Sequence, residues 1–334
     1  MALYNYINFR KFQQAMQPLN LASSSVLKVF EYSDVDEFRS PLNSSLIHVT
    51  PTRAGRISAM QAVLALPNCE IYLLRTFPRI VDLEIPANRT LVLFSMVGTS
   101  DTVINGQQLD HPSLILGRGP TDYRMIEGDQ TCVAGIRFNS AMLDRGWPQT
   151  GRMIVVFRIM EPVLIELQVL IREMLAAASS SPSQWSTNPA RQAAQETVLV
   201  ALDKAFLGTS LRDLERARSF QNSLHIVKQI EARLSSNLAE AIYSEELASE
   251  LRISVRTMHT AMLKIRGMSL HRYLRLRRLW AVRRQLLAGD KTLQIKACAL
   301  SNGFWHMGEF AALYAAQFGE TPSMTLARSQ KRLA

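Results

Sequence analysis

A helix, a short turn and a second helix are predicted twice in the last third of the 334-residue chain, and this repeat restricts the fold more than any other feature. In the first copy, a helix over residues 244–251 is followed by the break Arg252-Ile253-Ser254 and by an apolar stripe over Val255–Ile265. The pattern returns roughly 49 residues later, with a turn at 302–304 and a second helix over Trp305–Phe318. The repeat predicts an all-α region of two helix-turn-helix units.

Hydroxyl side chains can satisfy the unpaired backbone N–H groups at a helix start, so they indicate where these helices begin. Four such N-caps are predicted: Ser244, Ser254, Ser269 and Thr292. Ser269 precedes a long helix over Leu270–Leu287 that ends at Gly289-Asp290. A helix of that length measures about 27 Å, comparable to the ~34 Å of one DNA turn. This linker helix is therefore expected to hold the two units at a fixed separation.

The net positive charge of the chain is concentrated in the same region. Residues 223–334 contain 17 Lys and Arg against 8 Asp and Glu, a net charge of +9 out of +10 for the whole chain. The densest cluster of arginines lies within residues 271–284. This asymmetry indicates a module that binds a polyanion, and double-stranded DNA is the predicted partner. Charge alone leaves RNA and a membrane surface open as partners.

Residues 30–140 have the pattern of a β-rich domain. Short apolar runs bounded by turn residues are the expected strands: 62–66, 70–74, 90–94 and 133–138. The Asn105-Gly106 pair, which follows residues 101–104, favours a type I′ hairpin. Regularly spaced short strands suggest a small barrel or sandwich, and a barrel of this size can enclose one small ligand.

A pair of helices is expected after the strands, over Glu161–Ala178 and Pro189–Phe206, separated by the Ala- and Ser-rich break at 176–182. The first helix has one apolar stripe at helical spacing, made of Val163, Leu164, Leu167, Leu170, Ile171 and Met174. Two interpretations of this stripe remain open: it packs on its own domain, or it forms the seam of a homodimer.

These patterns predict an α+β protein of two domains. Residues 1–210 form a β-rich sensing and dimerisation domain with its helical pair over 161–206. The polar segment 211–222 is the linker, and residues 223–334 form the all-α DNA-binding domain of two helix-turn-helix units.

Several other classes of protein are disfavoured by the sequence. The longest apolar stretch, Met153–Ile171, is interrupted by charged residues, and Met1–Phe12 does not have the pattern of an export signal, so a cytoplasmic protein without membrane spans is expected. Three scattered cysteines indicate neither disulfides nor a zinc site. The six histidines have no metal-ligand spacing, and no nucleophile–base constellation occurs, so neither a metal, a cofactor nor an enzymatic activity is predicted.

The C-terminal part resembles the AraC family of transcriptional regulators over residues 225–328. The matching residues are Leu247-Ala248, Ile253-Ser254, Gly267-Met268-Ser269, Tyr273-Leu274, Arg277-Arg278-Leu279, Ile295, Ala299, Gly303-Phe304, Phe310, Phe318-Gly319 and Pro322-Ser323. The resemblance implies two helix-turn-helix units that place one recognition helix each in successive major grooves. The N-terminal part more loosely resembles the cupin-related sensor domains that often precede this DNA-binding unit.

Residue by residue, the resemblance assigns the first recognition helix to Val255–Ile265 and starts the second near His306. The expected DNA-binding residues are Arg256, Thr257, His259, Thr260, Lys264, Arg278, Arg283, Arg284, His306, Met307, Gly308 and Glu309. Arg278, Arg283 and Arg284 are expected either to contact phosphate or to lie on a solvated face. The second helix departs from the family at Glu309, Ala312 and Ala315-Ala316, where basic or polar residues are common. Glu309 is either a base reader or a solvated charge, and the second unit is expected to bind more weakly.

The resemblance implies an effector-responsive activator of a catabolic operon, with a small-molecule effector, RNA polymerase and a second copy of the chain as partners. Two other classes of function compete with it: a constitutive architectural DNA-binding protein, and an enzyme with a cupin-like barrel. Ligand-dependent thermal stabilisation favours a sensor, turnover favours an enzyme, and the absence of both favours the architectural protein.

Overall fold

The computed structural model describes residues 20–333 apart from 39–46, 54–55, 98–101, 130, 140–144, 237, 241 and 291. The chain divides into two compact units. The first runs to Phe220, and the second runs from Gln221 and also includes Thr50–Arg56. The segments Met1–Phe12 and Asp101, on which two sequence predictions rest, lie outside the described residues.

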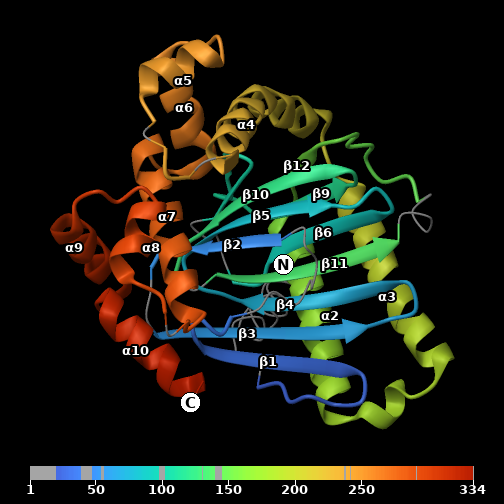
Figure 1. The fold of residues 1–334 in the computed structure, drawn as a ribbon. Helices are drawn as coiled ribbons and strands as arrows, with labels where there is room; N and C mark the ends of the chain where they lie inside the picture. Colours follow the sequence, from blue (N-terminus) through green and yellow to red (C-terminus); the bar gives the residue numbers. More distant parts are fainter. Residues whose placement is uncertain are drawn as a thin grey trace. The chain divides into compact units, whose positions relative to one another are not determined.

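The first unit contains two antiparallel sheets that face each other (Figure 1). One has seven strands in the order β1 (Leu27–Asp34), β3 (Arg56–Ala65), β4 (Cys69–Arg75), β11 (Cys132–Asn139), β6 (Arg89–Ser95), β9 (Ser113–Arg118) and β12 (Ile154–Arg158). The other has five, in the order β2 (Ile47–Pro51), β5 (Arg79–Ile85), β10 (Thr121–Glu127), β7 (Val103–Ile104) and β8 (Gln107–Gln108). The predicted β-rich domain is confirmed, and its sheets extend to Arg158.

The predicted hairpin is also confirmed. Strands β7 and β8 pair antiparallel, with Val103 opposite Gln108 and Ile104 opposite Gln107. Asn105 and Gly106 both have positive φ, 46° and 87°, as a type I′ turn requires. The side chain of Asn105 fixes this turn to β10, because its Oδ1 accepts a hydrogen bond from the backbone N–H of Arg124 at 2.7 Å.

Helices α2 (Glu161–Ser180) and α3 (Asn188–Phe206) cover the outer face of the seven-stranded sheet, and the short 3-10 helix η2 (Pro182–Trp185) joins them (Figure 1). The apolar stripe of α2 is used here: Leu164, Leu167, Ile171 and Met174 are buried in the same core cluster as the sheet, and Val163 and Leu170 pack against it. The stripe therefore packs on its own unit, and these side chains do not supply a homodimer seam.

The segment predicted as a linker is helical. Helix α4 (Leu211–Ser236) begins where the linker was expected and continues across the boundary between the units at Phe220. Its first turns belong to the first unit, because Ala217 is buried in that core and Asp213 Oδ2 accepts the backbone N–H of Arg158 at 3.2 Å. The polar composition of these residues fits the outer face of a helix as well as a loop.

The second unit repeats the predicted pattern. Its helices are α5 (Ser244–Glu250), α6 (Val255–Arg266), α7 (Leu270–Leu287), α8 (Ile295–Ser301), α9 (Met307–Phe318) and α10 (Pro322–Leu333). Helices α5 and α8 each have 7 residues, and α6 and α9 each have 12. The linker helix α7 has the predicted bounds, Leu270–Leu287. Among the described residues, no helix is long and apolar enough to cross a membrane.

Two of the four predicted N-caps are confirmed and two are wrong. Ser254 accepts the N–H of Thr257 at 3.0 Å, and Ser269 accepts that of Arg272 at 3.4 Å. Ser244 lies inside α5, where its hydroxyl is 3.2 Å from Nε2 of His271. Thr292 precedes α8 by three residues and bonds Asp290 instead, because a carboxylate two residues away offers a local turn.

Candidate nucleic-acid interface

The turn between α5 and α6 orients the second helix of the first helix-turn-helix unit. The N–H of Ile253 donates to the carbonyl of Ala248 at 2.9 Å, which closes α5 and reverses the chain. Arg252 takes the left-handed conformation that this reversal needs, with φ of 55°. One face of α6 is then buried through Met258, Met262 and Ile265. The opposite face is left at the surface.

That surface face of α6 carries the predicted base readers. Arg256, Thr257 and Thr260 are exposed, whereas His259 and Lys264 are half-buried. The Thr257 hydroxyl lies 2.8 Å from Ser254 Oγ, and the Thr260 hydroxyl donates to the carbonyl of Arg256 at 2.9 Å. Arg256 therefore presents the guanidinium donors of this face, and the threonines offer acceptor lone pairs.

The second unit has the same turn with different chemistry. The N–H of Phe304 donates to the carbonyl of Ala299 at 3.0 Å, as Ile253 does to Ala248 in the first unit. Here Gly303 supplies the left-handed conformation, with φ of 81°. A Cβ at Gly303 would lie 2.9 Å from the backbone oxygen of Ala239, so the position also requires the absence of a side chain.

Helix α9 presents a surface with few hydrogen-bonding groups. His306 is the exposed N-cap residue and makes no side-chain cap, Met307 is half-buried, and Gly308 and Glu309 are exposed. Exposed Ala311 and Ala312 continue this face, while Phe310 and Tyr314 are buried. The turn also exposes 67% of Trp305, which was expected inside the helix. The exposed surface of α9 is therefore apolar and weakly acidic, in contrast to that of α6.

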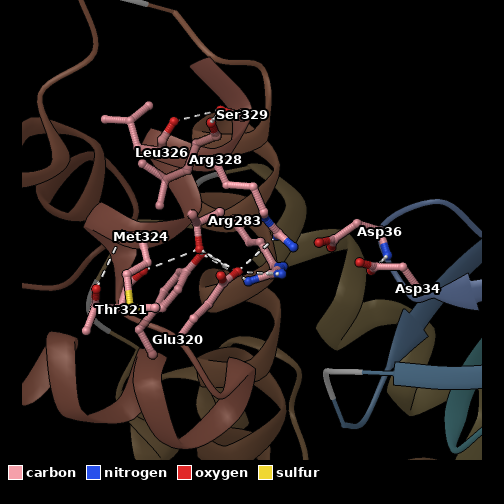
Figure 2. Close-up of polar contacts among 12 residues, drawn as sticks. Asp34, Asp36, Arg283, Glu320, Thr321, Met324, Leu326, Arg328 and Ser329 are labelled. Carbon is pink, nitrogen blue, oxygen red and sulfur yellow. Dashed lines mark hydrogen bonds and ion pairs between the residues drawn. The ribbon is translucent and has the colours of Figure 1, made fainter. Parts of the chain in front are cut away.

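Arg283, predicted as a phosphate contact, is a core residue. Its side chain is 4% exposed and its Nη2 lies 3.0 Å from Oε1 of Glu320, with the guanidinium 4.5 Å above the ring of Phe318. Arg328 donates to the same Glu320 oxygen at 3.0 Å (Figure 2). The phosphate contact predicted for Arg283 is wrong, because its donors are used between α7 and the start of α10.

The other two linker-helix arginines differ from each other. Arg278 is half-buried, and its guanidinium donates to the backbone oxygens of Leu238 at 2.7 Å and Glu240 at 2.6 Å. It ties the loop after α4 to α7, which conflicts with a role in binding phosphate. Arg284 is exposed, as are Arg272 and Arg275, which sequence reasoning did not single out.

Sequence reasoning also missed a buried ion pair that anchors α6. The side chain of Arg266 is fully buried, and its Nε donates to Oε1 of Glu231 on α4 at 2.6 Å. Tyr273 on α7 donates its hydroxyl to the same oxygen at 3.0 Å. These contacts link α6, α4 and α7. No local pattern indicates the pair, because its residues are 35 positions apart.

A second candidate site lies inside the first unit, where the two sheets enclose a cavity of about 50 Å³. Most of its lining residues are apolar, and Arg79 and Glu127 in the lining form a buried ion pair. Strand register decides which residues face it: on β4, Tyr72 and Leu74 line the cavity while Ile71 and Leu73 face the helices. This alternation is why the sequence alone could not name the lining.

Comparison with known proteins identifies the C-terminal region. Residues 247–328 match a family described as a helix-turn-helix domain. The "XylDLEGF operon transcriptional activator 3" of Pseudomonas putida is 34% identical over 100 residues, which cover 30% of each chain. The "XylDLEGF operon transcriptional activator 2" of the same organism is 36% identical over 94 residues, which cover 28% of this chain and 60% of that protein.

Among solved structures, a probable AraC family transcriptional regulator from Rhodopseudomonas palustris CGA009 is 34% identical, with a TM-score of 0.30. The match covers 32% of this chain and 98% of that one. The AraC-like transcriptional activator CuxR covers 82% of this chain and 100% of its own at 15% identity, with a TM-score of 0.39. The chain spans about a third of the length of the first of the relatives named above.

Proposed function

With residues 247–328 forming an AraC-type DNA-binding domain, we propose that the whole protein is a sequence-specific transcriptional regulator that binds DNA with two unequal helix-turn-helix units. The observation that carries this proposal is the exposed face of α6, where Arg256, Thr257 and Thr260 project from a helix fixed on its other side by Met258 and Met262. A helix held in this way can enter a major groove with its polar side chains toward base edges.

The two helix-turn-helix units contribute unequally to DNA binding. Arg256 reads a base, since guanidinium donors match guanine, and Thr257, His259, Thr260 and Lys264 border it. Helix α9 with His306, Met307, Gly308 and Glu309 enters the next groove and contributes less, because its exposed side chains offer few donors. Arg284, together with Arg272 and Arg275, binds phosphate without reading sequence.

The two-sheet unit senses a small molecule in its cavity, and the protein acts as a cytoplasmic activator of a catabolic operon, in contact with RNA polymerase. Activation is supported by the names of the Pseudomonas putida relatives, which are operon activators. The protein forms a homodimer through the C-terminal part of α3, where Val200 and the C-cap residue Leu207 are 56% and 86% exposed. These two residues are seven positions apart and so share one face of the helix.

Selection of binding sites from random double-stranded DNA by the full-length protein tests the proposal. We expect an enriched motif with one strong and one weak element about one helical turn apart. Arg256→Ala should abolish the strong element, and Glu246→Ala, which changes an exposed charge on α5, is the matched control. Recovery of no motif would contradict the proposal. Sedimentation of Leu207→Glu against the natural protein tests the homodimer, which should dissociate.

A further inference from the structure

The cavity of the first unit contains a buried carboxylate that is only half satisfied. Glu127 ends β10, and its side chain is fully buried. Its Oε2 accepts from the Thr76 hydroxyl at 2.8 Å and from Nε of Arg79. Its Oε1 is also buried and has no hydrogen-bond partner in the described part of the chain. A buried acceptor without a donor is costly, so a molecule that supplies a donor here gains affinity.

Apart from the buried Gln61 on β3, most of the remaining lining is suited to an apolar body. Val81, Leu91, Leu93 and Val133 line it from three strands. Tyr123 adds its ring, but its hydroxyl donates to the Met125 sulfur at 2.8 Å and so is already engaged. The hydroxyl of the second tyrosine in the wall, on β4, donates to Glu70 outside the lining. Neither phenol is thus directed at Glu127.

Charge selects among the donor-bearing molecules that would fit. Arg79 and Glu127 form an ion pair without net charge, and the Arg79 guanidinium lies 5.2 Å from the ring centre of Phe38 and 5.7 Å from that of Phe77. An anionic ligand would place a second negative charge beside Glu127 in an apolar enclosure. A cationic ligand would leave a net positive charge there. An uncharged donor satisfies Oε1 and adds no charge.

The size of the cavity limits the ligand as well. Its volume of 50 Å³ holds only about three to five water molecules. A ring-sized molecule therefore has to displace a side chain of the wall. The ligand is consequently compact.

We propose that the first unit binds a compact, uncharged, mainly apolar molecule that carries one hydroxyl or N–H donor, and that Glu127 Oε1 accepts this hydrogen bond. The regulatory meaning of this ligand class rests on the proposed function. A phenol or an aromatic alcohol belongs to the class, and a carboxylate does not.

Titration calorimetry of the full-length protein at neutral pH with three matched probes tests the ligand class. Phenol supplies the donor, anisole replaces that donor by a methyl ether, and benzoate is anionic. We expect saturable binding of phenol, and binding weaker by about tenfold or more for anisole and benzoate, because one buried acceptor goes unpaired or meets a like charge. Benzoate binding as tightly as phenol, or no saturable binding of phenol, would overturn the proposal.

Glu127→Gln tests the role of the residue. Thr76 and Arg79 both donate to Oε2, so the amide oxygen should take that place and the amide NH₂ should face the cavity. We expect the preference to invert, with anisole bound more tightly than phenol. Tyr123→Phe keeps the lining and should leave the preference unchanged. An unaltered preference for phenol in Glu127→Gln would overturn the assignment.

A second variant keeps the test decisive if Glu127→Gln does not fold. The double variant Arg79→Met with Glu127→Leu removes both charges, a replacement that buried ion pairs often tolerate. It should bind toluene and phenol alike, and a retained preference for phenol would overturn the proposal. DNA binding without any probe is measured on the same samples and tests the proposed function separately, since probe selectivity does not depend on it.

Discussion

The two helix-turn-helix units have the same backbone arrangement, but their exposed side chains differ in chemistry. In both, a 7-residue helix, a turn closed by equivalent hydrogen bonds and a 12-residue helix follow one another. Both second helices end at a glycine with positive φ, Gly267 at 66° and Gly319 at 69°. Yet α6 exposes Arg256 and two threonines, and α9 exposes Glu309 and alanines. The two units thus share buried positions in the second helix, and differ in the residues that this helix exposes.

The units also differ in how they are anchored. In the first, the fully buried Arg266 is held by Glu231 and lies 5.1 Å from the ring centre of Tyr273. In the second, Arg283 has Glu320 together with two hydroxyls, Tyr314 Oη at 3.4 Å and Thr325 Oγ1 at 3.5 Å. Two hydroxyls therefore stay beside the second arginine when its carboxylate is lost.

The largest effect is expected from removing the anchoring carboxylate of the first unit. Glu231→Ala leaves Arg266 buried without its counter-ion. We expect a loss of about 3–5 kcal/mol in the free energy of unfolding of the whole C-terminal compact unit, which begins at Gln221. Glu320→Ala should cost less, because the two hydroxyls remain beside Arg283. Urea unfolding followed by circular dichroism measures both. A larger loss for Glu320→Ala would reverse the comparison.

The next effect concerns DNA binding. Arg256→Ala should weaken specific binding by ~1–3 kcal/mol, the range for one good base contact. Glu309→Ala should change it less, or strengthen it by removing a negative charge near phosphate. Fluorescence anisotropy on the selected site and on scrambled DNA separates specific from nonspecific loss. A greater loss of specificity for Glu309→Ala would show that the second unit is the main reader.

A smaller effect is expected at the helix caps. Ser254→Ala removes the acceptor for the Thr257 N–H and should cost about 1 kcal/mol of stability. The equivalent His306 makes no side-chain cap, so His306→Ala should leave stability nearly unchanged. Thermal unfolding of both variants is the measurement, and equal losses would contradict the difference between the caps.

The smallest effect is expected at the turn residue with positive φ in the first unit. Arg252→Gly relieves the left-handed strain of a residue with a Cβ. It should stabilise the C-terminal compact unit by up to roughly 1 kcal/mol. Gly303→Ala, at the matching position, should destabilise it through both its φ and the contact with Ala239. If Arg252→Gly lowers the unfolding temperature, the strain argument fails at this turn.

The sequence by itself determined the local features of this protein. Each of these features follows from residues that are close together in the sequence. They are the two-helix pattern of each repeat, the caps at Ser254 and Ser269, the bounds of α7 and the Asn105-Gly106 hairpin. Periodicity, turn chemistry and capping act over that range. The concentration of positive charge after residue 222 is likewise a property of composition.

Only the tertiary structure decided which charged residues are available. Arg256, Arg278 and Arg283 look alike in sequence, but Arg278 is bound to a carbonyl 40 positions away and Arg283 to Glu320, while Arg256 is exposed. Likewise, only strand pairing places Glu127 in a cavity beside Thr76, 51 positions away. Burial depends on partners distant in the chain, so no local pattern could distinguish an exposed arginine from one that holds the fold together.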